Sequence, residues 1–169
     1  TARAAFPGAN GKIAFEANRD PSREVYVINP DGSGETNITN NLIEDDDARW
    51  SPDGSKLVFA RETATNDDIF VMNADGSNVV QLTNDPASDL MPKVSPDGGR
   101  IAFASNRAGN WDIFVMPVQG GRAIQITSNA ADDLHPSWSP DGTQLVFCRL
   151  GEVSGQWEMW VTDVGNSGV

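Results

Sequence analysis

The chain has 169 residues, of which 24 are acidic and 12 basic, and its formal net charge is −12. This charge disfavours nucleic acid and anionic membranes as partners, because both would repel the protein. No apolar run reaches the roughly 20 residues that a membrane span needs, and a single cysteine, Cys148, excludes an internal disulfide. A protein, a peptide, a neutral ligand or a metal ion remain possible partners.

A short turn sequence recurs along the chain at a constant spacing. Trp-Ser-Pro-Asp-Gly occurs at 50–54 and 138–142, Val-Ser-Pro-Asp-Gly at 94–98, and a weaker copy, Phe-Pro-Gly-Ala-Asn, at 6–10. Pro fixes φ at the second turn position, and Asp-Gly supplies a side-chain acceptor and tolerates positive φ. An apolar triplet follows each copy and ends in phenylalanine every 44 residues, at Phe15, Phe59, Phe103 and Phe147. The chain is therefore a repeat protein, with units at 5–48, 49–92, 93–136 and 137–169.

Each repeat divides into short predicted strands. The first strand is brief and ends on a large apolar residue, at positions 6, 50, 94 and 138. The second and third strands are apolar on both faces, which indicates that both faces are covered; they lie at 13–15, 57–59, 101–103 and 145–147, and at 25–28, 69–72, 113–116 and 159–161. The fourth strand alternates apolar and polar residues, at 36–38, 80–82 and 124–126. One of its faces is therefore partly exposed to solvent.

This burial pattern predicts an all-β protein built from β-propeller blades. Four-stranded antiparallel sheets that stack face to face around an axis cover the middle strands fully and the outermost strand least. A period of 44 residues is typical of such blades, and no segment has the three-and-four apolar spacing of a helix. We expect four four-stranded repeats, of which the last lacks its outer strand.

The incomplete last repeat leaves three assemblies open. The chain is a fragment of a larger ring, or two copies complete one ring as a homodimer, or four blades close as a monomer. The edge at 159–161 would carry unpaired backbone groups beside apolar side chains, which favours pairing with another chain. The first two assemblies are therefore preferred.

The repeat resembles that of the TolB-like β-propeller family (PD40 or WD40-like repeats). The matching residues are the run 133–142, Asp-Leu-His-Pro-Ser-Trp-Ser-Pro-Asp-Gly, the run 106–109, Asn-Arg-Ala-Gly, and the run 69–76, Ile-Phe-Val-Met-Asn-Ala-Asp-Gly. The resemblance covers residues 5 to about 161. It implies a propeller like those of periplasmic binding proteins, of prolyl-oligopeptidase-like peptidases and of some polysaccharide lyases. With the small residues Ala2-Arg3-Ala4, typical of the end of a signal peptide, it predicts a periplasmic or secreted location.

Three aspartates recur on the face that carries the longer loops. Asp45, Asp89 and Asp133 are again 44 residues apart, so radial repetition would place them in equivalent positions near the channel mouth. A ring of carboxylates could hold calcium, which favours several oxygen ligands. The alternative is that each aspartate caps its own loop or pairs with an arginine such as Arg19 or Arg107, in which case no cofactor is bound.

Aromatic residues and one histidine complete the candidate site on this face. Trp111 and Trp157 precede the third strand of their repeats and could stack on a partner, or seal the groove between blades. His135, the single histidine, could act as a base, or carry no special role. We predict a contact patch for a protein or peptide, made of Trp111, Trp157, Asp89, Asp133, His135 and Arg107.

The chain lacks the sequence motifs of an enzyme. It has no Gly-x-Ser-x-Gly, His-Glu-x-x-His or Cys-x-x-Cys motif and no phosphate-binding glycine loop. We therefore predict a non-catalytic scaffold. The alternative is the propeller domain of an enzyme, which gates a hydrolase domain or carries a lyase site.

Overall fold

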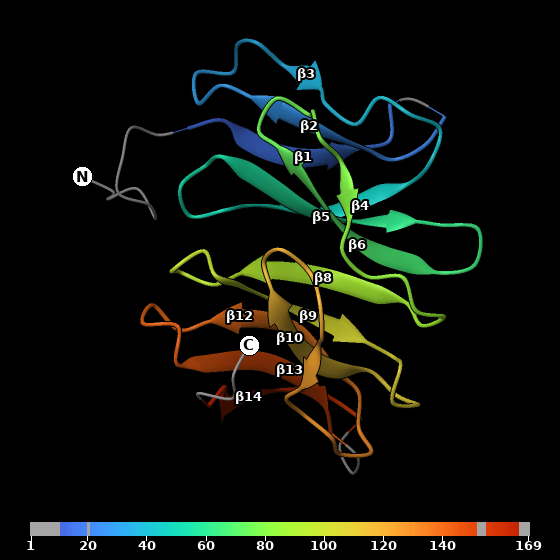
Figure 1. Ribbon diagram of the computed structural model, residues 1–169, viewed down its shortest axis with the longest axis vertical. Coiled ribbons are helices and arrows are strands. Elements are labelled where there is room, and N and C mark those ends of the chain that lie inside the picture. The colour runs from blue at the N-terminus through green and yellow to red at the C-terminus, as the bar shows by residue number, and fades with distance from the viewer. Residues whose placement is uncertain (1–10, 20, 152–154, 166–169) are drawn as a thin grey trace.

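Four antiparallel sheets, one per repeat, make up the protein (Figure 1). The computed structural model describes residues 11–19, 21–151 and 155–165. Within these ranges the chain forms strands and no α-helix. There is accordingly no helix in this part of the chain that could span a membrane. The predicted all-β propeller architecture is confirmed. The predicted first strand ending at position 6, and Ala2-Arg3-Ala4, lie outside the described residues.

Within each sheet the strands lie side by side in chain order. The second and third sheets have an inner strand, two middle strands and an outer strand; the described part of the first sheet begins with the second strand of its repeat, and that of the fourth ends with the third. The first and second sheets consist of β1 (Ile13–Ala17), β2 (Glu24–Ile28) and β3 (Thr36–Asn37), and of β4 (Asp45–Trp50), β5 (Lys56–Glu62), β6 (Asp67–Asn73) and β7 (Val80–Gln81). The third and fourth consist of β8 (Asp89–Val94), β9 (Arg100–Ser105), β10 (Asp112–Pro117) and β11 (Ile124–Gln125), and of β12 (Asp133–Trp138), β13 (Gln144–Leu150) and β14 (Trp157–Asp163).

The recurring Ser-Pro-Asp-Gly sequence forms the turn between the first two strands of a sheet. In the second sheet the Ser51 hydroxyl donates to Asp53 at 2.6 Å and accepts the Lys56 N–H at 3.0 Å. Gly54, at φ 70°, donates its N–H to the Ser51 carbonyl at 2.9 Å, a conformation that glycine adopts without strain. The same contacts recur in the third and fourth sheets, so this turn sets the register of each repeat.

Apolar side chains from neighbouring sheets form the core. Between the second and third sheets, Val58 and Ile69 belong to one buried cluster with Ile101 and Phe103. Corresponding clusters lie between the first and second sheets and between the third and fourth. The repeats therefore stabilise one another through their faces, as repeat proteins do.

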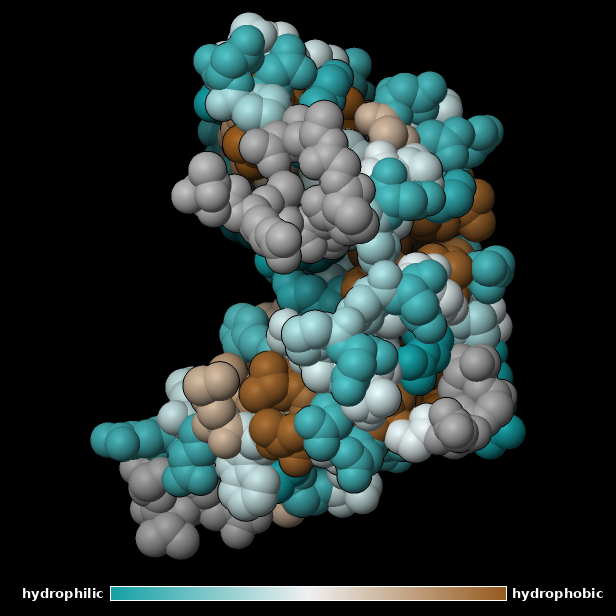
Figure 2. Space-filling model, turned by 90° about the vertical axis from the view of Figure 1, so that its left-hand side faces the viewer, coloured by the Kyte–Doolittle hydropathy of each residue, from teal (hydrophilic) through white to brown (hydrophobic). Residues whose placement is uncertain are grey.

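The four sheets form an open arc. The inner strands β4, β8 and β12 lie next to one another, and the space-filling view is hollowed at mid-height on one side (Figure 2). The second sheet begins at Asp45, inside the range 5–48 that the sequence assigns to the first repeat. The inner strands have six residues, whereas the sequence predicts brief ones, and the outer strands have only two.

Candidate functional site

The three recurring aspartates open the inner strands, and each one pairs with an arginine. Their side chains are fully buried. Asp45 contacts Arg61 at 2.6 Å, and Asp133 contacts Arg149 at 2.7 Å. Both arginines lie on the neighbouring strand, directly opposite their aspartates. A buried carboxylate needs such a partner, because an unpaired buried charge is costly.

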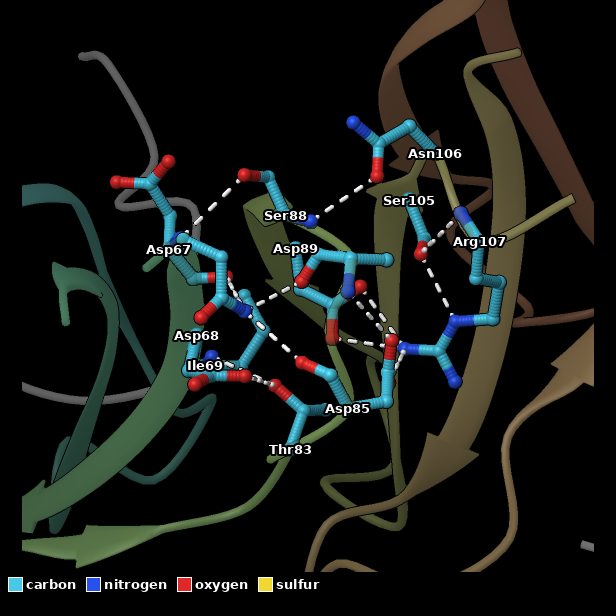
Figure 3. Close-up of polar contacts among 12 residues, drawn as sticks. Asp67, Asp68, Ile69, Thr83, Asp85, Ser88, Asp89, Ser105, Asn106 and Arg107 are labelled. Carbon is cyan, nitrogen blue, oxygen red and sulfur yellow. Dashed lines mark hydrogen bonds and ion pairs between the residues drawn. The ribbon is translucent and has the colours of Figure 1, made fainter. Parts of the chain in front are cut away.

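In the third sheet the arginine comes from a loop instead (Figure 3). Ser105 stands where the other sheets have arginine, and Arg107 reaches Asp89 at 2.7 Å. The guanidinium also contacts Asp85 at 2.8 Å, and the Ser105 hydroxyl accepts its Nε–H. The ring centroids of Phe103 and Phe114 lie 5.4 Å and 4.9 Å from the same guanidinium carbon. Arg107 is therefore held by two carboxylates and two aromatic rings.

This pairing leaves no ring of free carboxylates for a metal. Among the described residues, no three His, Cys, Asp or Glu side chains lie close enough to hold an ion. Burial raises the pKa of Asp89, although hydrogen bonds from Ser105 and Arg107 oppose this shift. Asp45, Asp89 and Asp133 do not fit a calcium site, and pairing with arginine, the alternative reading, describes their geometry.

A second set of buried acids lies at the start of the third strand of the first three repeats, and consists of Glu24, Asp68 and Asp112. Asp68 accepts the Thr83 hydroxyl and Asp112 the Thr127 hydroxyl, each at 3.1 Å. Burial raises the pKa of both acids, while the threonine hydrogen bonds act against it. These acids and threonines recur 44 residues apart, but none of them is among the predicted site residues. Their contacts join the third strand to the outer strand.

A strained backbone position recurs at the middle of each inner strand. Asp47, Met91 and His135 have φ of 55°, 59° and 56°, a left-handed conformation that is costly for residues with side chains. Each one lies in a β-bulge, where the register against the next strand shifts. We call residues 46–49, 90–93 and 134–137 the inner rim.

The inner rim combines one backbone shape with different side chains. The Asp47 carboxylate accepts the Met91 N–H at 3.2 Å, which links adjacent sheets, and lies 4.0 Å from the Arg49 guanidinium. Burial, and then the charge of Arg49, lower the pKa of Lys93 to about 8. Equivalent rim positions therefore carry different groups: Asp47, Met91 and His135 at one, and Arg49, Lys93 and Ser137 at another.

Some residues of the predicted contact patch lie together: Arg107 contacts Asp89, and the Trp111 carbonyl accepts the Asp133 N–H at 2.7 Å. His135 is exposed on the inner rim, and Trp157 is exposed at the start of β14. Trp111 is half-buried and packs against the cluster between the third and fourth sheets. Asp89 and Asp133 are buried, and Arg107 holds the first of them. Only His135 and Trp157 of the six combine exposure with a side chain free of these ion pairs.

Comparison with known proteins places this geometry in a family. A family model described as the TolB beta propeller domain, PD40, matches residues 45–169. A protein assigned as TolB from Agrobacterium tumefaciens is similar at 26% identity and a TM-score of 0.79, over 89% of this chain and 57% of that one. TolB from Acinetobacter baumannii is similar at 23% identity and a TM-score of 0.81, over 94% of this chain and 39% of that one. An oligogalacturonate lyase in complex with manganese is similar at 20% identity and a TM-score of 0.67, over 89% of this chain and 43% of that one.

These matches fix the family and leave the activity of the whole protein open. The chain spans about half the length of these solved structures. No curated protein matches the sequence. The family model covers the second, third and fourth sheets, where the turns, the buried acid pairs and the inner rim recur. The chain belongs to the TolB beta propeller (PD40) family.

Proposed function

We propose that this propeller is a non-catalytic scaffold that binds a protein or peptide partner on the face that carries the inner rim. The proposal includes a periplasmic or secreted location, which the likeness to TolB supports. Rigid stacked sheets preorganise a binding surface and so reduce the entropy lost on association. The net charge of −12 favours a partner with a basic segment.

The inner rim is the observation that carries the proposal. Buried polar positions repeat with the same chemistry in successive sheets, as Asp45, Asp89 and Asp133 do. The rim positions repeat only in backbone shape, since Asp47, Met91 and His135 share a positive φ and differ in chemistry. Strained backbone that is retained beside variable side chains is typical of recognition sites.

Selection from a random displayed peptide library tests this function. Peptides selected on the unchanged protein should bind at least about tenfold more weakly to a rim variant with Arg49→Ala and His135→Ala, since both side chains are exposed there. The matched control carries Lys56→Ala and Gln144→Ala, two exposed residues next to the short turns, and should bind like the parent. Peptides that bind the rim variant as tightly as the parent, but bind the turn control more weakly, would contradict the proposal.

The likeness to a lyase supports a second function, the propeller of an enzyme. In that case His135 would act as a base, or the propeller would gate a hydrolase domain elsewhere in the protein. The chain contains a single histidine, and its buried acids are engaged by arginines. Manganese-dependent cleavage of oligogalacturonate that is lost with His135→Ala would favour the lyase over the scaffold.

A further inference from the structure

Two basic side chains lie at equivalent positions of the inner rim. Arg49 and Lys93 each follow a positive-φ position by two residues, on the adjacent strands β4 and β8. Each pairs with the equivalent residue of the next strand in its own sheet. Because the two sheets repeat the same backbone shape, the two side chains leave their strands on the same side. Arg49 is exposed and Lys93 is half-buried.

Lys93 is a charged group without a close partner. Its ammonium forms no hydrogen bond or ion pair within the part of the chain that the structure describes. Burial, and then the charge of Arg49, lower its pKa to about 8, while the charges of Asp47 and Glu16 act in the opposite direction. A half-buried cation beside a second cation is costly, so an anion bound by both would relieve this cost.

The two acids that act on this lysine are already engaged by backbone N–H groups. Asp47 Oδ2 accepts the Met91 N–H at 3.2 Å, and Glu16 Oε1 accepts the Ala48 N–H at 3.1 Å. The Arg49 guanidinium lies 4.0 Å from Asp47 and donates to the Ala48 carbonyl at 2.7 Å. These acids therefore link neighbouring sheets, and neither forms an ion pair with the lysine.

The backbone around Lys93 is held from both sides. Trp138 of the fourth sheet donates its indole N–H to the Lys93 carbonyl at 2.9 Å. Asp47 of the second sheet holds the N–H of Met91, two residues before the lysine. A side chain on fixed backbone loses less freedom when it binds a ligand. Lys93 is thus positioned in advance for a group that comes from outside the chain.

We propose that Arg49 and Lys93 bind the side-chain carboxylate of an aspartate or glutamate in the partner. This inference rests on the proposed function, since it names the group that the inner rim recognises in a protein or peptide. A guanidinium and an ammonium together offer several N–H donors to the two carboxylate oxygens. Lys93 lies on β8, between β4 and β12, so a segment that follows the rim crosses it away from the segment's ends. This position favours a side chain over a terminal carboxylate.

The overall charge of the protein is compatible with this contact. The net charge of −12 acts on the approach of a partner, but exposed charges more than about 10 Å apart are largely screened from one another at 0.1 M salt. A group bound at Lys93 is influenced mainly by the charges close to it, which are those of Arg49, Asp47 and Glu16. A partner segment that is basic around one acid satisfies both conditions.

Peptides selected from the random displayed library on the unchanged protein are the probes for this inference. Each is labelled with fluorescein and followed by anisotropy, and each of its acids is replaced in turn by the matching amide. On the unchanged protein, one of these replacements should weaken binding at least about tenfold, because a hydrogen bond to a charged group is lost. An amide at the C-terminus of the peptide should change nothing.

Variants of the protein identify the residue that the acid contacts. Lys93→Met should weaken binding of the original peptide and remove its advantage over the amide-substituted peptide. Lys93→Arg keeps the charge and should retain most of that advantage. Lys56→Met, at an exposed lysine next to a short turn, is the matched control and should bind like the parent.

Three results would overturn the inference. Selected peptides that contain no acid, or whose acids all tolerate replacement, would show that the rim does not require a side-chain carboxylate. A loss caused only by the C-terminal amide would assign the basic pair to a chain end. An acid whose replacement weakens binding equally in the parent and in Lys93→Met would lie elsewhere. The proposed function fails by a different result, in which the selected peptides bind the Arg49→Ala, His135→Ala variant as tightly as the parent, and this inference then fails with it.

Discussion

Single residues stabilise this protein mainly through buried acids with dedicated partners. The three aspartates that open the inner strands are fully buried beside arginines, whereas the neighbouring Asp85 is one-third exposed. The equivalent positions in the other repeats are Asn41 and Asn129, whose amides donate to Asp45 and Asp133. An amide is therefore compatible with the site of Asp85, and the site of Asp89 requires a charge.

We expect Asp89→Asn to destabilise the protein by about 3 kcal/mol, because it leaves the Arg107 guanidinium without its buried partner. Asp85→Asn is the matched control and should cost less than about 1 kcal/mol, as partly exposed ion pairs do. Urea unfolding at neutral pH measures both free energies. Equal losses for the two variants would show that burial does not set the strength of this pair.

The aspartates of the short turns give stability a pH dependence. Hydrogen bonds from Ser51 and Ser139 lower the pKa of Asp53 and Asp141, each to about 2. Because these folded-state pKa values lie below the unfolded value, the stabilisation is fully present above about pH 4 and is lost as the pH falls towards 2. The double variant Asp53→Asn, Asp141→Asn should be less stable than the parent at pH 7, and this difference should shrink as the pH falls from 4 to 2. A difference between them that is the same at both pH values would be inconsistent with these shifts.

At the scale of the elements, the inner strands combine regular pairing with a strained bulge. Trp138 donates its indole N–H to the Lys93 carbonyl at 2.9 Å, which ties β12 to β8, and Asp47 ties β4 to β8 through the Met91 N–H. These contacts hold the positive-φ positions in place, since strained backbone persists only where its surroundings fix it.

His135 tests this strain because its side chain is exposed. His135→Gly should leave the free energy of unfolding within about 1 kcal/mol of the parent, since relief of strain offsets the greater freedom of glycine in the unfolded chain. His135→Val should cost about 1–2 kcal/mol, because a β-branched residue fits a left-handed conformation poorly. Thermal and urea unfolding provide the measurement, and a valine variant as stable as the glycine variant would argue against a strained bulge.

At the scale of the whole molecule, stability depends on contacts between neighbouring sheets. Phe103 is fully buried between the second and third sheets, and Phe15 occupies the equivalent position in the first sheet, where it is only partly buried. We expect Phe103→Ala to cost about 3–5 kcal/mol, as truncations of buried aromatic residues do. Phe15→Ala should cost clearly less in the same urea titration. Similar losses would mean that the end sheet is packed as tightly as the interior ones.

The sequence predicts the fold well because each 44-residue repeat forms one sheet, and the apolar residues of each repeat pack against the neighbouring sheets. The phenylalanines at 59 and 103 are buried as the apolar pattern predicts, and the Ser-Pro-Asp-Gly turns lie where proline and glycine place them. The site is harder to predict, because the same periodicity marks both buried ion pairs and exposed loops. Asp89 and Asp133 recur because each forms a buried ion pair with an arginine. The positive φ at Met91 is not predicted by any sequence pattern.

Recognition of a partner at the inner rim is tested most directly by nuclear magnetic resonance. The isotope-labelled chain is titrated with a peptide selected on the unchanged protein, and the shifts of the backbone amides are mapped. We predict that the largest shifts fall at residues 46–49, 90–93 and 134–137. Shifts confined to the short turns at 52–55, 96–99 and 140–143, beyond the ends of the inner strands, would contradict it.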